Sequence, residues 1–549
     1  MKINRYNKIP FYLKELILFV ILLFGLSCET EQEKVEGFER LRVEKLSKPR
    51  PLIHNNDGDD HLFSLKSSSE FSIQSFLDIR SSGLAGIGIS TLSYCTSRSF
   101  SLFTHKTGVG ETYTKDFYLP ERKNIVSELM KVGTDPLEVT INFAHEQGFE
   151  FFWSNRMNDT HDAAHRPDKP HAQWNSFKEE HPEFLFGGIG ERLPHGQWSA
   201  VDFSHKEIRD LCVQFFTEVC ENYDVDGVEL DFFRHLYLFK NVAKGEVASE
   251  EQVGMITDMV TRIREMTKRV GMEKGTPILV LTRVPDSFEY CRSVGIDLEE
   301  WMEKDLIDIV VGGGYFRLNP WNYLVEQGQK YGVKIYADFS ESRIKDGQHP
   351  LLIRNQDAVY RARAAAAWEA GADGIYSFNE FNMRRQYLRE IGKPEELKNT
   401  SNLYFVTYRN GNPNAYLKEG KKYLTLPVLS PVNPIPIESE PLNFMIEIGD
   451  EKNRAKVYLI LFGREINPED LEVLVNNVKV LIKKSTPDGL FVYEVSDNTM
   501  QPGINHLSLR NLNGNVKSGS NPSLLDAAIL FSRDSNDPAL KELTEICLN

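Results

Sequence analysis

The sequence contains few cysteines for its length, six in 549 residues. One lies near the N-terminus, and the other five are odd in number and far apart: Cys95, Cys212, Cys220, Cys291 and Cys547. Disulfide frameworks use an even number of Cys, and zinc-binding Cys come in closely spaced pairs. The spacing therefore predicts neither kind of site, and we expect these five thiols to be buried apolar groups.

Basic residues are fewer than acidic residues. Lys and Arg together number 64 against 79 Asp and Glu, which gives a formal net charge of −15. Binding to nucleic acid, or to anionic lipid through charge alone, needs a basic surface. The composition therefore argues against both kinds of partner. A chain of this length with 41% hydrophobic and 26% charged residues is otherwise typical of a globular protein of two or three domains.

Several motifs of phosphate, nucleophile and metal chemistry are missing. The sequence has no glycine-rich phosphate loop after its first predicted strand, no Walker loop, no GxSxG elbow and no HxH metal pair. The first absence argues against a doubly wound dinucleotide-binding fold. We therefore expect no cofactor and no metal.

The N-terminal apolar run is too short to cross a membrane. It covers the eleven residues from Leu16 to Leu26 and follows a basic start, whereas a spanning helix needs about 20 residues. This pattern predicts a secretory signal over residues 1–27. The segment Gly25-Leu26-Ser27-Cys28 resembles a bacterial lipobox, which implies that Cys28 is lipidated and holds the protein in the cell envelope, in the outer membrane, the periplasm or at the cell surface. An uncleaved membrane anchor is the alternative.

Composition divides the remaining chain into four parts. Residues 28–65 are polar and charged, which predicts a flexible tether. Residues 66–400 alternate between strand-like and helix-like patterns, and residues 401–441 form a linker that ends in a proline-rich stretch. Short alternating runs separated by turn residues over 442–549 predict a β-sandwich, which could bind carbohydrate or brace the first domain.

The alternating part predicts a (β/α)8 barrel, the TIM-barrel fold. Strands that alternate with helices imply a parallel sheet, and eight such units over about 300 residues fit a closed barrel. An open, doubly wound sheet is the alternative. The strand-like runs cover residues 84–96, 149–156, 198–203, 226–235, 278–283, 307–312, 333–338 and 374–380.

The fourth run, Asp226 to His235, carries the most information. Side chains alternate along a strand, so Glu229 and Asp231 share one face while apolar residues occupy the other. Carboxylates on one face are unusual in a parallel sheet, but they are expected where a barrel strand ends, because active sites of these barrels lie at that end. We therefore expect Asp231 to be catalytic or to bind substrate. An aspartate bonded to Arg234 or Arg283 is the structural alternative, and the deeper Glu229 is expected to form a buried ion pair.

The other predicted strand ends supply the rest of a polar site. Paired carboxylates beside aromatic and amide side chains are what glycosidic cleavage needs, one as acid and the other as base or nucleophile. Glu380 and Asp338 are alternative partners for Asp231, and the run Gly312-Gly313-Gly314 suits close approach of a substrate. The residues expected to bind substrate are Arg156, Asn158, Asp159, His161, Arg283, Tyr315 and Asn379.

These motifs resemble the bacterial family 10-like glycoside hydrolases over residues 80 to 400. The resemblance lies in Arg156-Met157-Asn158-Asp159, in the Asp-Gly-x-x-x-Asp ending at Asp231, and in the segment 371–376. It implies a secreted TIM-barrel enzyme, commonly a lipoprotein, that hydrolyses O-glycosidic bonds of a polysaccharide or oligosaccharide outside the cytoplasm. A carbohydrate-binding lipoprotein without activity and a scaffold of an uptake complex are the alternatives. The fourth run is also similar to the family-18 chitinase strand, but Phe233 stands at the position of the acid Glu, which excludes that mechanism.

Overall fold

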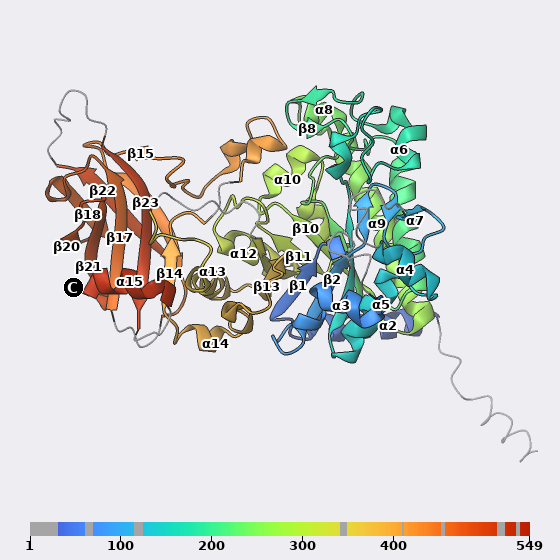
Figure 1. The fold of residues 1–549 in the computed structure, drawn as a ribbon, viewed down its shortest axis with the longest axis horizontal. Helices are drawn as coiled ribbons and strands as arrows, with labels where there is room; N and C mark the ends of the chain where they lie inside the picture. Colours follow the sequence, from blue (N-terminus) through green and yellow to red (C-terminus); the bar gives the residue numbers. More distant parts are fainter. Residues whose placement is uncertain are drawn as a thin grey trace, which may run out of the picture.

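Eight parallel strands close into a barrel in the computed structural model, which describes residues 31–60, 70–114, 124–340, 349–408, 411–451, 456–512, 522–533 and 538–548. Around the barrel the strands follow the order β1-β13-β12-β11-β10-β9-β6-β2. Antiparallel sheets follow in the C-terminal part, drawn in orange and red in Figure 1. The TIM-barrel prediction is confirmed. The strands are β1 (Leu52–Asn56), β2 (Thr91–Cys95), β6 (Glu150–Arg156), β9 (Gly227–Asp231), β10 (Leu279–Val284), β11 (Ile309–Gly312), β12 (Lys334–Ser340) and β13 (Gly374–Phe378).

Helices between the strands bury one apolar face against the barrel. In the longest, α9 (Glu250–Lys274), the hydroxyl of Ser249 accepts a hydrogen bond from the backbone N–H of Gln252, and Gly275 ends the helix at a positive φ of 73°. Such caps satisfy backbone groups that have no partner within the helix. Other helices between the strands include α5 (Pro136–Glu146), α7 (Lys206–Asn222), α11 (Leu298–Glu303), α12 (Trp321–Tyr331) and α13 (Asp357–Glu369). The last of these, α13, is also covered by the C-terminal sheets and is buried on more than one face.

Two features of the N-terminal half differ from the sequence prediction. The segment expected to be a tether contains the helix α2 (Glu31–Ser47) and the first barrel strand, β1. The run 198–203, expected to be a strand, contributes no barrel strand and belongs to the long connection between β6 and α7. All six residues of this run are buried, so its apolar side chains pack within the connection and not in a barrel strand. One barrel strand was missed and one was predicted where none exists, so β9 is still the fourth barrel strand along the chain.

The helix α2 is bound to the N-terminal face of the barrel by ion pairs. Arg42 contacts Asp308 at 2.8 Å, and Lys45 contacts Asp226, just before β9, at 3.0 Å. The following Arg50 contacts Glu150, the first residue of β6, at 2.5 Å. These contacts explain why a segment with a polar composition is ordered: three of its basic side chains pair with carboxylates of the barrel.

The C-terminal part is a sandwich of two antiparallel sheets. One has the order β14-β23-β17-β21-β20 and the other β16-β22-β18-β19, and apolar side chains of both sheets form one buried cluster. The prediction of a β-sandwich is confirmed, although the chain enters it earlier than expected, at β14 (Asn402–Phe405), and the central β23 (Ser523–Ser532) was not predicted. The other strands are β15 (Ile435–Pro436), β16 (Leu442–Ile448), β17 (Lys456–Arg464), β18 (Leu471–Val475), β19 (Val478–Lys479), β20 (Ile482–Ser485), β21 (Leu490–Val495) and β22 (Gly503–Asn511).

Two further predictions concern cysteines and the membrane. The five cysteines after Cys28 are buried and unbonded, as expected. The predicted signal segment and the lipidated Cys28 lie outside the described residues. Within the described ranges, no helix combines the length and the apolar character needed to cross a membrane.

Candidate active site

Asp231 is the last residue of β9 and lies at the C-terminal end of the barrel. Its Oδ1 accepts hydrogen bonds from the backbone N–H of Phe233 (3.0 Å) and Arg234 (2.8 Å) and from Nη1 of Arg283 (3.1 Å). No described residue donates a hydrogen bond to its Oδ2. The carboxylate is thus fixed through one oxygen, and its second oxygen is the one that could react.

Arg283 joins Asp231 to a second carboxylate. Its Nε donates to Oδ2 of Asp338 at 2.7 Å, and its side chain is fully buried. Burial alone would lower the pKa of Arg283. The negative charges of Asp338 and Asp231 have the larger effect and hold the pKa of Arg283 well above its ordinary value. The three side chains form a clamp across strands β9, β10 and β12, which we call the Arg283 clamp.

The Arg283 clamp is closely covered. The side chains of Asp231 and Asp338 are 2% and 0% exposed. A Cβ atom added to Gly314 would lie 2.6 Å from Oδ2 of Asp338 and 2.9 Å from Nη2 of Arg283. Glycine is required here because the backbone packs directly on the clamp, not because it leaves space for a substrate, as the sequence had suggested. The Tyr315 ring is also buried, with the Arg283 guanidinium 5.1 Å from its centre.

The structure distinguishes the two candidates for the second carboxylate. Asp338 shares Arg283 with Asp231, as described above. Glu380 instead accepts hydrogen bonds from the hydroxyl of Tyr387 (2.7 Å) and from Nη1 of Arg385 (3.3 Å). Asp338 is therefore the carboxylate that the fold brings beside Asp231.

Glu229 lies one layer deeper than Asp231 and forms no ion pair among the described residues. Its carboxyl group instead contacts the hydroxyl group of Tyr376 on β13, across the barrel, at 2.8 Å. It also contacts the hydroxyl group of Ser93 on β2, which is separated from β9 by β6 alone. The expected buried ion pair is therefore wrong. Burial, together with the charge of Asp231, raises the pKa of Glu229 to about 7.

This raised pKa predicts how stability varies with pH. Between pH 4.5 and about 7, folded Glu229 retains a proton that the unfolded chain has released, so stability falls as pH rises through this window. The shift corresponds to roughly 3 kcal/mol. Glu229→Gln is expected to remove this loss and to unfold at a higher temperature than the wild type at pH 8 but not at pH 4. The exposed Glu303→Gln is the control, and equal pH profiles for wild type and Glu229→Gln would contradict the assignment.

A second group of predicted residues lies after β6 and forms its own network. Arg156 donates to Oδ2 of Asp159 at 2.8 Å, and Asp159 accepts from Nδ1 of His161 at 2.6 Å. On the other side of the imidazole, Nη2 of Arg234 donates to Nε2 of His161 at 2.8 Å. Burial lowers the pKa of His161. Burial alone would raise the pKa of Asp159. The effect of His161 and Arg156 is larger and holds the pKa of Asp159 well below its ordinary value. The His161 side chain is 32% exposed and is thus the member of this network that a substrate could reach.

The same network contains three groups that could bind a metal. One ligand atom each of Asp159, His161 and His235 lies within 4.8 Å of the other two. However, Arg156 and Arg234 already donate to the Asp159 carboxylate and to Nε2 of His161. Two guanidinium groups beside the ligand atoms disfavour a cation there, so the geometry fits a hydrogen-bond network better than a metal centre.

The remaining predicted residues are placed differently. Asn158 is fully buried and donates to the backbone oxygens of Val201 and Tyr237, so it holds two loops together. Asn379 adopts a left-handed conformation with φ 58° after β13 and donates to Oδ2 of Asp57 at 2.8 Å. Asn379 thus lies at the C-terminal face, whereas Asn158 does not reach an open surface.

The sequence interpretation missed the carboxylates after β1. Asp57 forms an ion pair with Arg80 at 2.8 Å, and Asp59 forms one with Arg98. Both belong to the segment Asp57-Gly58-Asp59-Asp60, which was assigned to the tether. The signal was present, because a short strand-like run followed by carboxylates is the same pattern as that of the Asp231 segment.

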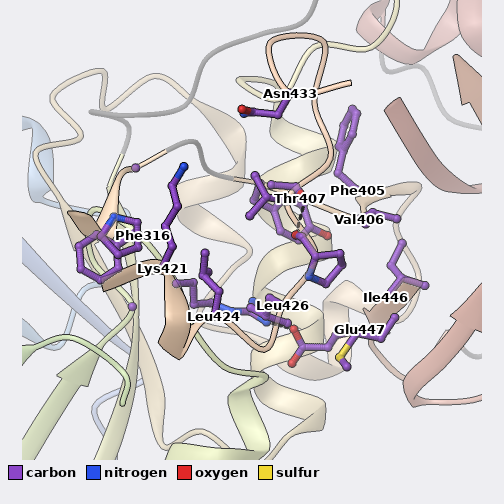
Figure 2. A pocket seen from close by; sticks show the side chains of 18 of the residues that line it. Phe316, Phe405, Val406, Thr407, Lys421, Leu424, Leu426, Asn433, Ile446 and Glu447 are labelled. Carbon is purple, nitrogen blue, oxygen red and sulfur yellow. Dashed lines mark hydrogen bonds and ion pairs between the residues drawn. The ribbon is translucent and has the colours of Figure 1, made fainter. Parts of the chain in front are cut away.

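A cavity of about 500 Å³ lies between the barrel and the C-terminal sandwich. Phe316 lines it from the barrel, while Phe405 and Glu447 line it from the sandwich (Figure 2). Asp338 of the barrel is a further lining residue. Ligand sites often lie at such domain boundaries. The cavity therefore connects the Arg283 clamp to the C-terminal domain, which contributes part of its wall.

The comparisons with known proteins concern the fold. The chain matches no family model and no curated protein sequence. Among solved structures, it is similar to α-L-fucosidase isoenzyme 2 from Paenibacillus thiaminolyticus (13% identity, TM-score 0.37), with 64% of this chain and 49% of the fucosidase covered. The chain thus spans about half the length of that enzyme.

Two further similar structures are covered almost completely. The PgaB (BpsB) glycoside hydrolase domain from Bordetella bronchiseptica shares 8% identity at a TM-score of 0.38, over 63% of this chain and 99% of that domain. A family 18 N-acetylglucosaminidase from Paenibacillus barengoltzii shares 13% sequence identity at a TM-score of 0.35. The match covers 62% of this chain and 98% of that enzyme. These proteins represent several glycoside hydrolase families, so the resemblance to the family 10-like proteins stays a prediction.

Proposed function

We propose that this protein is a glycoside hydrolase that cleaves O-glycosidic bonds of a glycan outside the cytoplasm. The observation that carries the proposal is the position of Asp231 at the C-terminal end of β9, with Oδ1 held by three donors and Oδ2 without one among the described residues. A base or nucleophile must be oriented in this way to react at one defined atom.

In this proposal the Arg283 clamp supplies the pair of carboxylates. Asp231 acts as base or nucleophile at the sugar carbon. Asp338, paired with Arg283 in the structure, takes up a proton from water before it protonates the leaving oxygen. Hydrolysis then adds the hydroxyl of water to the sugar carbon and a proton to the departing oxygen. Asp338 receives this role rather than Glu380 because it lines the cavity and shares Arg283 with Asp231.

The proposed location rests on the N-terminal sequence. The basic start, the eleven-residue apolar run and the position of Cys28 support export and lipidation of that cysteine in a bacterial envelope. Mass spectrometry of the N-terminal peptide from the native host tests this part of the proposal. A diacylated Cys28 is expected, and an intact residue 1 would contradict it.

The activity is tested by incubating the purified protein with a panel of neutral and acidic polysaccharides and measuring the reducing ends released. The wild type is expected to release sugars from at least one of them. Samples of the Asp231→Asn variant from the same preparation correct for contaminating hydrolases. A wild-type protein that binds a glycan and releases nothing would contradict the proposal.

The second candidate is a carbohydrate-binding protein without activity. It is favoured by the burial of Asp231 and Asp338, which leaves 2% or less of either side chain exposed. A hydrolase would have to move the segment around Gly314 to admit a sugar to these groups, whereas a binding protein would not. Binding without release of sugar in the same panel identifies this candidate.

A further inference from the structure

Arg363 of α13 is a buried cation with no counter-charge among the residues that the structure describes. The residue is 4% exposed, and it forms no ion pair or hydrogen bond with any described residue; its Nη1 is buried without a partner. The neighbouring buried arginines differ, because Arg361 contacts Glu390 at 3.3 Å and Arg354 contacts Asp526 at 2.8 Å. A buried charge without a partner is costly, so its presence calls for an explanation.

The Arg363 side chain is held by aromatic rings. Its guanidinium carbon lies 4.2 Å from the centre of the Phe339 ring and 5.1 Å from that of Tyr360. Such cation–π contacts fix the group without neutralising it. Arg363 lines the cavity between the barrel and the sandwich, so its unused donors are available to a ligand there.

The other ionic groups around the cavity leave it positive. Glu447 is bound to Arg317, and Asp338 is bound to Arg283. Lys421, an exposed lining residue, forms no ion pair with a described residue. Among the described residues, Glu447 has a cation of its own and Asp338 shares Arg283 with Asp231, whereas neither Arg363 nor Lys421 has a counter-charge.

We propose that this cavity binds an acidic sugar of the glycan, a uronic acid whose carboxylate pairs with Arg363. A guanidinium can donate two parallel hydrogen bonds to a carboxylate, and the volume of about 500 Å³ lies within the range of small-ligand sites. Lys421 supplies a second positive charge. The choice of a sugar as the carrier of the carboxylate rests on the proposed function, but the anion site does not.

The test measures binding by isothermal titration calorimetry of the full mature chain. The probes are digalacturonic acid, its neutral methyl ester and a sulfated disaccharide. The acid is expected to bind at least about tenfold more tightly than the ester, since the ion pair with the guanidinium is lost in the ester. Equal binding of acid and ester would overturn the proposal, and tighter binding of the sulfated sugar would overturn the assignment to a carboxylate.

Arg363→Met is the decisive variant because two readouts should move in opposite directions. Affinity for digalacturonic acid is expected to fall at least about tenfold, while the melting temperature without ligand rises by about 3 °C as the unpaired charge is removed. Arg361→Gln on the same helix is the matched control and should leave affinity unchanged. Unchanged affinity in Arg363→Met, or a drop in its melting temperature without ligand, would overturn the proposal.

These outcomes are independent of catalysis. Binding of the acid without cleavage supports the anion site and contradicts the proposed hydrolase. Cleavage of neutral glycans by a protein that does not bind digalacturonic acid supports the proposed hydrolase and contradicts the anion site.

Discussion

The Asp231→Asn variant is expected to lose glycan cleavage by a factor of about 10² to 10⁴, the range that a missing acid–base group commonly accounts for. The amide oxygen can still accept the hydrogen bonds of Phe233, Arg234 and Arg283, which hold Oδ1 in the wild type. The fold should therefore persist, while the amide can act neither as base nor as nucleophile. Initial rates on the best substrate of the polysaccharide panel measure the loss.

Asp226→Asn is the matched control for this loss. Asp226 precedes the same strand at the opposite face, where it contacts Lys45 and His145, both at 3.0 Å. The same chemical change is expected to lower stability there by about 1 kcal/mol or more and to leave the catalytic rate unchanged. Asp231→Asn with wild-type rates would rule out the proposed role of Asp231.

The second large effect is expected at Arg283. Its replacement by Met leaves Asp231 and Asp338 buried beside each other without the cation that both contact. Removing one partner from a buried ionic group costs about 3–5 kcal/mol. We therefore expect Arg283→Met to lower the barrel's unfolding midpoint in urea substantially, and to abolish cleavage as well.

A triple variant separates charge from packing. In Arg283→Met with Asp231→Asn and Asp338→Asn, no net charge remains in the clamp, and most of the lost stability should return. A triple variant as unstable as Arg283→Met alone would show that packing beneath Gly314, rather than charge, dominates the clamp.

The barrel could be predicted because seven of its strands have strong apolar patterns. β1 could not, since three of its five residues are the polar His54, Asn55 and Asn56, all buried. Buried polar residues inside a barrel look like an exposed segment when only the composition is considered. The opposite error arose at 198–203, where apolar residues buried in a loop connection resembled a strand.

For the candidate active site, the residues at the strand ends could be predicted from the sequence. The side chains that they contact could be predicted only in part. The alternation in β9 placed Glu229 and Asp231 on one face, and their location identified Arg283 as a possible partner. The choice between Asp338 and Glu380 depended on Tyr387 and Arg385, whose contacts with Glu380 arise from the local path of the chain after β13. Arg363 could not be found from sequence, because its significance lies in having no carboxylate partner among the described residues.

The contacts of α2 have a consequence for how an anchored protein would be oriented. Only Glu29 and Thr30 separate Cys28 from this helix, and so few residues reach at most about 10 Å. Since α2 is fixed to the N-terminal face of the barrel, a lipid on Cys28 would keep that face close to the bilayer surface. The opposite face, with Asp231 and His161, would then point away from the bilayer, toward long glycan chains that cannot enter the headgroup layer.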